Sequence, residues 1–398
     1  MIIRYLVGTL LVLTVTTLQA AELYDAIGAR LALMQEVAAY KWIHGQPIEV
    51  PEREAIVIEN AIRSGLDHGI TVNSSRLFFT AQIEAAKDIQ ECWFRRWEQE
   101  HAPTEAADLD RVVRPRLLAL GADINRLLAT ETHDEFLFMA RTKTDCLSGE
   151  RQQNVFNALK QIQVYPDRLS QIRDSGMVRI GTTGDYAPFS FAEDGDEPEG
   201  IDIDMANALA AYLKADLVLV KTSWPTLMQD LAQGRYDIAM SGVSRIPARE
   251  ELAYFSQAYH IGGKTPVARC SDVSDLGSLE AIEQPGRRVI VNPGGTNERF
   301  LDAHIRQATK VLHNDNRTIF GEILQERADV MFTDLIEAQL QSAKLPGLCM
   351  AMPTQTLTYQ EKAYMMPKDP GLLAEVNRWL KETQASGKLA ETFASHLN

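Results

Sequence analysis

Long apolar runs are nearly absent from this 398-residue chain. After the first twenty residues, no stretch approaches the roughly 18 apolar residues that a membrane-spanning helix needs. Positive charge is also in deficit, because 54 Asp and Glu outnumber 40 Lys and Arg and give a net charge of −14. That balance argues against a nucleic-acid partner and leaves no basic footprint for an anionic membrane. A site for an anion would have to concentrate positive charge locally.

Cysteine is scarce, and no Cys-x-x-Cys or His-x-x-x-His spacing is present to suggest a metal site. The four cysteines are Cys92, Cys146, Cys270 and Cys349. Four cysteines allow three pairings. If the two halves of the chain are separate domains, the pairing Cys92–Cys146 and Cys270–Cys349 keeps each disulfide within one domain.

The first twenty residues have the pattern of an export signal. Arg4 supplies a positive start, residues 5–17 form a short apolar core, and Ala20 is a small residue suited to cleavage. A short membrane anchor is the alternative, but the core is too short to span a bilayer stably. Export predicts a periplasmic protein, with no membrane contact after cleavage and with cysteines in an oxidising compartment.

Residues 21–150 predict an all-α domain. Leu23, Ile27 and Leu31 begin a series of apolar residues spaced three or four apart, and strand patterns are missing. The segment 45–47 ends the first helix, Asn73 or Ser74 is expected to cap the third, and a fourth runs over about 109–129. Residues 151–167 are expected to be a helical connector.

From Met177 onward, short apolar runs alternate with helical stretches, which predicts an α/β fold with largely parallel sheets. Two such sets predict two lobes within residues 168–398. The first lobe is expected over 168–266 and 358–398, and the second over 270–355. The fold class is therefore a multidomain chain, an all-α domain followed by a two-lobed α/β domain.

A glycine-rich turn follows the apolar run 288–291. Gly294 and Gly295 permit backbone angles closed to other residues, and Thr296 and Asn297 open a helix beside them. Free N–H groups at a helix start can cradle an anion. Most such turns are only turns, so the cradle alone does not establish a ligand site.

Several cations of the helical half lie on or near its predicted apolar faces. Arg30 stands between Ile27 and Leu31, and Arg126 precedes Leu127. Such residues usually extend their charged ends into solvent. Cations that instead reach a bundle interior are costly unless they bind an anion.

The segments 29–34, 37–42, 47–54 and 82–90 resemble the exported, all-helical class of chorismate mutase. The resemblance covers nearly all of residues 22–130, and Tyr40-Lys41-Trp42 followed by Pro47-Ile48-Glu49 is its most specific part. It implies that substrate carboxylates bind Arg30, Arg53 and Arg126, that Lys41 and Gln90 contact the ether oxygen, and that Glu54 contacts the ring hydroxyl. Some relatives have Thr or Ser where this chain has Ala86, which puts one hydrogen bond in doubt.

The segments 181–190, 200–206 and 241–249 resemble periplasmic amino-acid-binding proteins. In that family, residues matching Ser241, Arg249 and Thr296 hold a ligand carboxylate, and the one matching Asp334 holds an ammonium. The segments 222–225, 263–266, 292–300, 333–338 and 361–364 resemble one enzyme subfamily of this frame, cyclohexadienyl dehydratase. That resemblance implies conversion of prephenate to phenylpyruvate, and of arogenate to phenylalanine.

The dehydration needs a general acid, because the ring hydroxyl is a poor leaving group. With the resemblance, Glu337 is the expected acid, its pKa raised by burial, with Trp224 a candidate neighbour. Apart from the resemblance, a Glu near the start of a helix is usually a solvated residue that interacts favourably with the helix dipole. Asn292 and Asn297 are expected to orient the acid or the substrate, and Tyr186 is expected to close over the ring. Lys362 is a further candidate for a substrate-binding residue.

Together the two resemblances predict an exported bifunctional enzyme that makes phenylpyruvate from chorismate without a cofactor or metal. Its expected partners are small-molecule substrates and further copies of itself. Two alternatives remain: an amino-acid-binding protein fused to a helical domain, and a mutase whose α/β half senses phenylalanine. A pure binding protein has no need of an acid at Glu337.

Overall fold

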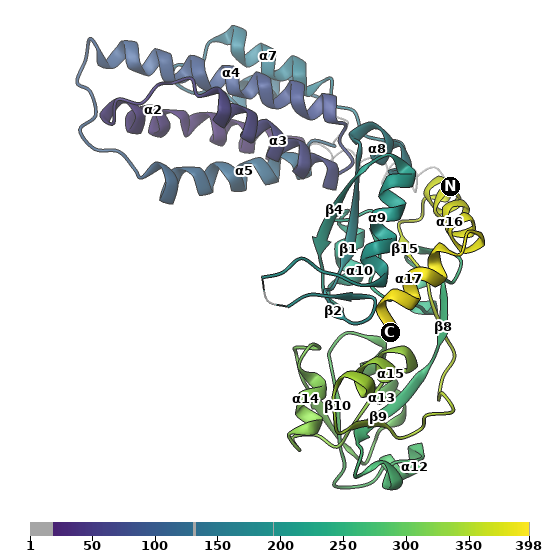
Figure 1. Cartoon of the computed structure of the whole chain (residues 1–398). Helices are drawn as coiled ribbons and strands as arrows, with labels where there is room; N and C mark the ends of the chain where they lie inside the picture. The colour runs from purple at the N-terminus through teal and green to yellow at the C-terminus, as the bar shows by residue number, and fades with distance from the viewer. Residues whose placement is uncertain (1–18, 130–132, 194, 398) are drawn as a thin grey trace, which may run out of the picture. The chain divides into compact units, whose positions relative to one another are not determined.

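The computed structural model describes residues 19–129, 133–193 and 195–397, so the predicted export signal lies almost wholly outside the described residues. The chain divides into two compact units, residues 1–166 and 167–398 (Figure 1). Within the described residues, no helix is both long enough and apolar enough to cross a membrane.

The first unit is helical, as expected. Residues 19–32 are helical and continue into α2. The third helix is capped by Thr71, whose hydroxyl accepts from the Ser74 N–H, and not by Asn73 or Ser74. The expected fourth helix begins as a π-helical turn, η1. The elements are α2 (Met34–Ile43), α3 (Pro51–Asp67), α4 (Val72–Trp97), η1 (Leu109–Val113), α5 (Arg114–Leu127), α6 (Glu135–Arg141) and α7 (Gly149–Leu159).

The predicted connector 151–167 is not a linker. Residues 149–159 form α7, which packs along α4 in the same unit (Figure 1). Val155, Phe156 and Leu159 are fully buried in the helical core. A helix that buries three large apolar side chains against its neighbours is part of a domain core. The boundary between the two units therefore falls at Pro166 and Asp167.

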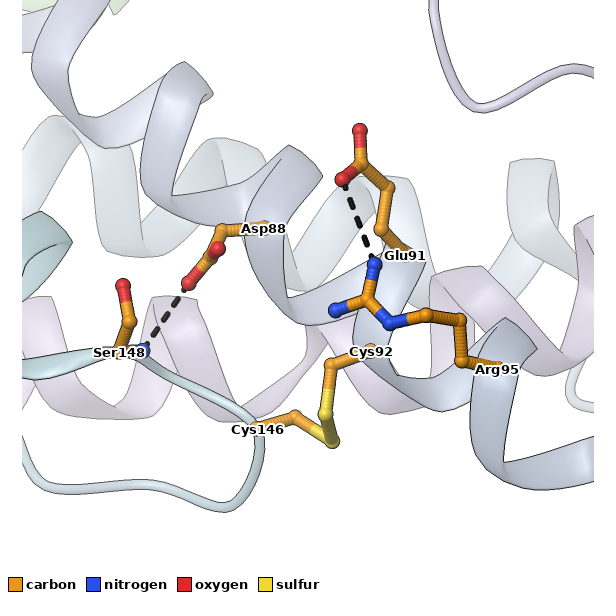
Figure 2. Close-up of a disulfide and its surroundings, with 6 residues drawn as sticks. All are labelled: Asp88, Glu91, Cys92, Arg95, Cys146 and Ser148. Atoms are coloured by element: carbon orange, nitrogen blue, oxygen red, sulfur yellow. Dashed lines mark hydrogen bonds and ion pairs between the residues drawn. A yellow bond between two sulfur atoms is a disulfide. The ribbon is translucent and has the colours of Figure 1, made fainter.

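The disulfide Cys92–Cys146 joins α4 to the segment between α6 and α7 (Figure 2). Beside it, the Ser148 backbone N–H donates to the Asp88 carboxylate at 3.0 Å, which holds the same segment to α4 a second time. Both links precede α7 in the chain. They therefore fix the entry of α7 onto the face of α4.

The first lobe of the second unit is built on a five-stranded sheet in the order β4-β1-β5-β15-β7. Its centre, formed by β1, β4 and β5, is parallel, and β15 and β7 add antiparallel edges. The C-terminal helices return to this lobe and contribute Trp379 and Leu380 to its core. Its elements are α8 (Arg168–Ser175), β1 (Met177–Thr182), β2 (Asp185–Tyr186), β3 (Ser190–Phe191), α9 (Ile201–Leu213), β4 (Asp216–Lys221), α10 (Leu227–Ala232), β5 (Ile238–Ala239), α11 (Pro247–Glu250), β7 (Tyr254–Phe255), β15 (Met365–Met366), α16 (Pro370–Ala385) and α17 (Lys388–Leu397).

The second lobe repeats this plan with the sheet β11-β10-β12-β9-β13, in which β10, β11 and β12 are parallel. The disulfide Cys270–Cys349 joins the end of β9 to its neighbour β13. The elements are β9 (Lys264–Arg269), η2 (Val273–Asp275), α12 (Leu279–Ile282), β10 (Arg288–Val291), α13 (Thr296–His304), β11 (Thr309–Leu312), α14 (Ile319–Leu324), β12 (Val330–Asp334), α15 (Leu335–Lys344) and β13 (Leu348–Met350).

The lobe boundary lies slightly earlier than expected. Residues 264–266, assigned to the first lobe from the sequence, begin β9 and pair with β12 of the second sheet. A small sheet of β6 (Ser244–Arg245), β14 (Gln360–Lys362) and β8 (His260–Gly262) lies at the crossover between the lobes. The two-lobed α/β expectation is confirmed, with antiparallel edges that apolar runs alone do not reveal.

Candidate active sites

A cavity of about 650 Å³ lies within the helical unit, among α2, α3, α4 and α5. Arg30, Met34, Val37 and Lys41 reach it from one side because residues three or four apart share a helix face. Most of the predicted cations and polar residues line it. The predicted residues on its wall are Arg30, Lys41, Arg53, Glu54 and Gln90.

Arg30 is the deepest cation of this cavity. Its side chain is only 8% exposed, and burial lowers the pKa of the guanidinium to about 10. It donates to the Gln82 amide oxygen at 3.2 Å, while its buried Nε has no partner and no carboxylate pairs with it among the described residues. A buried guanidinium without a protein anion is an anion-binding group.

Lys41 and Gln90 present polar groups to the same space. Lys41 Nζ donates to the Ile48 carbonyl at 2.7 Å, and burial lowers the pKa of the ammonium. Gln90 donates to the Ala86 carbonyl at 2.9 Å, while its buried Oε1 has no partner among the described residues. The remaining hydrogen-bonding capacity of these side chains is available to a bound ligand.

Glu54 is held at the cavity wall by two interactions. Its carboxylate accepts from the Val50 N–H at 3.4 Å and lies 3.6 Å from Lys87 Nζ. Lys87 also pairs with Glu49 and Glu84, and these carboxylates raise its pKa. A carboxylate in this position can accept a hydrogen bond from a ligand hydroxyl.

Arg126 does not line this cavity. Its side chain is 56% exposed and pairs with Asp123. The arginine that reaches the cavity from α5 is Arg114, three turns earlier on the helix. The sequence suggested that Arg126 lies close to an apolar face because Leu127 and Leu128 follow it; the two leucines are buried, whereas Arg126 is exposed. The cluster of arginines at 111, 114 and 116 was the signal that was missed.

A second, much smaller cavity of about 20 Å³ lies between the two lobes of the α/β unit. It has room for about one water molecule, so the lobes must part before a larger ligand enters. Most of the predicted residues of this half line it. The wall is formed by Tyr186, Trp224, Gly242, Ser244, Arg249, Asn292, Gly295, Thr296, Asn297, Asn316, Asp334 and Lys362.

Asp334 binds two buried lysines at once. Lys264 Nζ lies 2.7 Å from Oδ1, and Lys362 Nζ lies 2.5 Å from Oδ2. The Tyr186 hydroxyl donates to Oδ2 from the first lobe. The two ammonium groups hold the pKa of Asp334 below its usual range in spite of its burial. Two lysines and one carboxylate give the cluster a formal charge of +1 at the cleft, although burial lowers the pKa of Lys362.

Glu337 lies one helical turn beyond Asp334, on α15, and is 1% exposed. Burial raises the pKa of its carboxyl to about 8, and the charges of Asp334 and Asp185 act in the same direction. The Thr333 hydroxyl donates to Oε2. Glu337 is not on the wall of the closed cavity. A carboxyl in this environment is protonated at neutral pH and can act as a general acid.

Trp224 packs against two apolar core clusters of the α/β unit and also contacts residues of the cleft. Its Nε1 donates to the Asp185 carboxylate at 3.0 Å, and its ring lies edge-on to Tyr186, with the ring centroids 5.7 Å apart. Burial raises the pKa of Asp185. Lys362 lies over the Tyr186 ring, 5.0 Å from its centroid. The tyrosine is thus fixed by Asp334, Lys362 and Trp224 together.

Of the residues predicted to hold a ligand carboxylate, Arg249 and Thr296 line the cavity and Ser241 does not. Arg249 is 4% exposed, donates to the Ser244 carbonyl at 2.9 Å and has no acidic partner among the described residues. Ser241 is fully buried and bonded to Thr183, and it does not line the cavity. Ser244, which was not predicted as a site residue, lines it instead and accepts from Lys362 at 3.0 Å.

Gly294 is required by the cradle, whereas Gly295 is not. Gly294 has φ +82°, and a Cβ there would lie 2.6 Å from the Pro225 nitrogen of the first lobe. Gly295 has φ −92°, and a Cβ there would meet no atom closer than 3.8 Å. The Gly294 N–H donates to Glu298 at 2.7 Å, so part of the cradle is closed by its own helix. Thr296 remains on the cavity wall.

Asn297 and Asn292 contact each other at 3.4 Å, and Asn297 accepts from Lys264. They therefore connect the lysine cluster to the cradle, beyond shaping the turn. Lys264 itself is 1% exposed and was missed as a site residue. A lysine at the start of the strand Lys264–Arg269, just before the apolar residues 266–268, was the available signal. Asn316, also on the cavity wall, lies in a polar loop that gave none. Among the described residues, no cluster of His, Cys, Asp or Glu is suited to a metal ion.

Two protein families match this chain in separate segments. The chorismate mutase type II family matches residues 21–91, and family 3 of the bacterial extracellular solute-binding proteins matches residues 178–398. The second match covers more than half of the chain.

Individual relatives resemble the α/β unit. Cyclohexadienyl dehydratase of Pseudomonas aeruginosa is 47% identical over 230 residues, which are 58% of this chain and 86% of that protein. The L-cystine-binding protein TcyJ of Escherichia coli is 24% identical over 222 residues, 56% of this chain and 82% of that protein. The crystal structure of the ancestral amino acid-binding protein AncCDT-1, a precursor of cyclohexadienyl dehydratase, is 30% identical with a TM-score of 0.54. That match covers 58% of this chain and 99% of the other.

Proposed function

The chain belongs to family 3 of the bacterial extracellular solute-binding proteins and carries a chorismate mutase type II domain before it, and from this premise we propose a bifunctional enzyme of phenylalanine biosynthesis. The helical unit rearranges chorismate to prephenate. The α/β unit converts prephenate to phenylpyruvate with loss of water and carbon dioxide, and arogenate to phenylalanine in the same way.

The helical cavity fits a rearrangement that needs no nucleophile and no acid. Chorismate carries two carboxylates, which suit the three arginines on the cavity wall, Arg30, Arg53 and Arg114. The Lys41 ammonium and the Gln90 amide supply donors for the ether oxygen, which gains negative charge as its bond breaks. Glu54 accepts from the ring hydroxyl. The cavity accelerates the reaction by holding a compact conformer and stabilising this charge.

The dehydratase assignment depends on one observation, the buried Glu337 carboxyl with its pKa raised to about 8. Glu337 gives its proton to the ring hydroxyl of prephenate, and the C–O bond breaks to release water. The ring carboxylate leaves as carbon dioxide, and its bonding electrons complete the aromatic ring. Arg249 and the surplus positive charge around Asp334 hold the substrate carboxylates.

A binding protein is the competing assignment, because relatives such as TcyJ are named for binding an amino acid. A pure binding protein has no need of a buried acid, whereas in this chain the buried Glu337 carboxyl lies one helical turn beyond Asp334. That feature favours the enzyme.

The family is extracellular, which supports export of this chain. The finer proposal is cleavage after Ala20 and a periplasmic enzyme that forms a homo-oligomer. Size-exclusion chromatography with light scattering of the secreted protein, and its N-terminal sequence, test these two points.

The decisive experiment gives the purified protein chorismate and follows the products over time. We expect prephenate to form first and then to decline as phenylpyruvate accumulates. Prephenate that accumulates without phenylpyruvate would assign the α/β unit to binding. Added prephenate, supplied alone, tests the second step independently of the first.

A further inference from the structure

Asn316 is a cleft residue with an unused hydrogen-bond acceptor. It lies between β11 and α14 of the second lobe, on the wall of the cleft cavity, and is 4% exposed. Its Nδ2 donates to the Asp185 carbonyl of the first lobe at 2.9 Å. Because that partner is an acceptor, the bond fixes which end of the amide is nitrogen.

The oxygen of the Asn316 amide, Oδ1, is buried and makes no hydrogen bond among the described residues. Leaving a buried acceptor unpaired costs about 1–3 kcal/mol. An acceptor kept at this cost on the wall of a binding cleft is suited to a donor on the ligand.

The neighbours of Asn316 show which part of a ligand reaches it. Asp185, whose carbonyl it binds, also accepts from Trp224 and lies close enough to raise the pKa of Glu337. Asn316 and Trp224 therefore meet at Asp185 on the cleft wall, within electrostatic reach of the buried Glu337, whereas Arg249 offers a cation without an acidic partner among the described residues. In prephenate the hydroxyl is para to the carbon that bears both acidic arms. A substrate anchored by its carboxylates directs this hydroxyl away from them, toward the acid.

We propose that Asn316 Oδ1 accepts a hydrogen bond from the ring hydroxyl that leaves during dehydration, an inference that rests on the proposed function. As Glu337 transfers its proton, the hydroxyl oxygen becomes positively polarised and acquires a second O–H. The bond to Oδ1 is then stronger in the transition state than in the bound substrate, so it lowers the barrier. Asn316 thereby stabilises the departing water while Glu337 supplies the proton.

The test replaces Asn316 with leucine in the full-length chain, which keeps the volume and removes the acceptor. We expect Asn316→Leu to lower kcat for prephenate about a hundredfold. Asn314→Leu is the matched control, because Asn314 is an exposed asparagine two residues away, and its kcat should stay within about twofold of the parent. Asn316→Ala, which also removes the acceptor, provides a second variant with the same expected loss if the leucine disturbs folding, and chorismate turnover by the helical unit checks the protein concentration.

A second readout separates the proposed contact from a structural role. Phenylpyruvate keeps the ring and the keto acid but lacks the hydroxyl, so its inhibition constant reports cleft closure without this bond. A loss in kcat that exceeds the loss in phenylpyruvate affinity supports the proposal. An equal or smaller loss in kcat, or no loss, overturns it and leaves Asn316 as a bridge between the lobes. Failure of the parent protein to dehydrate prephenate would instead refute the proposed function.

Discussion

Lys264 Nζ lies 2.7 Å from Asp334 Oδ1, and both side chains are almost inaccessible to solvent. Lys362 occupies the other carboxylate oxygen at 2.5 Å. Two buried ammonium groups thus depend on one carboxylate for charge compensation. The pairs also connect β9 and β14 to the end of β12, so they contribute to the fold as well as to the cleft.

Removal of this carboxylate should destabilise the α/β unit strongly. Asp334→Asn leaves two lysines buried without a counter-charge, which typically costs about 3–5 kcal/mol. Chemical denaturation of the α/β unit measures this loss. Glu250→Gln, which breaks the exposed pair with Arg245, should cost at most about 1 kcal/mol. Similar losses in the free energy of unfolding for the two variants would show that the buried cluster stabilises the protein no more than an exposed ion pair does.

The same cluster predicts a pH dependence of stability. The pKa of Asp334 is lower in the folded protein than the value of about 4 expected for an unfolded chain. Its contribution is therefore complete above about pH 4 and is lost as the pH falls toward the folded pKa. Between about pH 4 and pH 2, the free energy of unfolding should fall more steeply in the parent than in Asp334→Asn. Parallel curves would contradict the assignment.

Glu337→Gln should abolish dehydration while chorismate still disappears. The glutamine keeps the shape of the side chain but cannot give a proton to the leaving hydroxyl. We expect prephenate to accumulate from chorismate with no phenylpyruvate. Normal dehydration by this variant would exclude Glu337 as the acid. Glu322→Gln, on α14 and paired with Arg327, is a control outside the acid's surroundings.

The rate of dehydration should depend on the protonated form of Glu337. Since the folded pKa is raised to about 8, the acid is intact at neutral pH and is lost as the pH rises through that value. In the parent, kcat should fall about tenfold per pH unit above the pKa. A rate that is constant up to about pH 9.5 would be inconsistent with this role.

In the helical unit, two arginines of α5 should behave oppositely. Arg114→Ala removes a cation from the cavity wall and should lower kcat/KM for chorismate by about a hundredfold or more. Arg126→Ala changes an exposed side chain paired with Asp123 and should leave the rate within about twofold. Steady-state assays of chorismate loss compare them. An inactive Arg126→Ala with an active Arg114→Ala would restore the assignment made from the sequence.

Patterns in the sequence predicted the structure correctly where residues close together along the chain determine it. The spacing of Leu23, Ile27 and Leu31 predicted a buried helix face, and all three are buried. The change of period near Met177 predicted the α/β unit. Arg30 and Lys41 could be placed together because an eleven-residue separation is about three helical turns. The same reasoning failed for Arg126, since an apolar stripe next to a residue does not determine the side on which its own side chain lies.

The sequence by itself determined the order of the two units, the helical face that carries Arg30 and Lys41, and the turn at Gly294 that opens α13. These follow from periodicity and backbone geometry, which act over a few residues. Only the tertiary structure decided that Arg114 and not Arg126 lines the helical cavity, that Lys264 and Lys362 bind the two oxygens of Asp334, and that Asn316 donates to the Asp185 carbonyl. Those relationships join residues separated by up to 131 positions. They arise when buried charges and amides find partners during folding, and that choice depends on which strands and lobes come together.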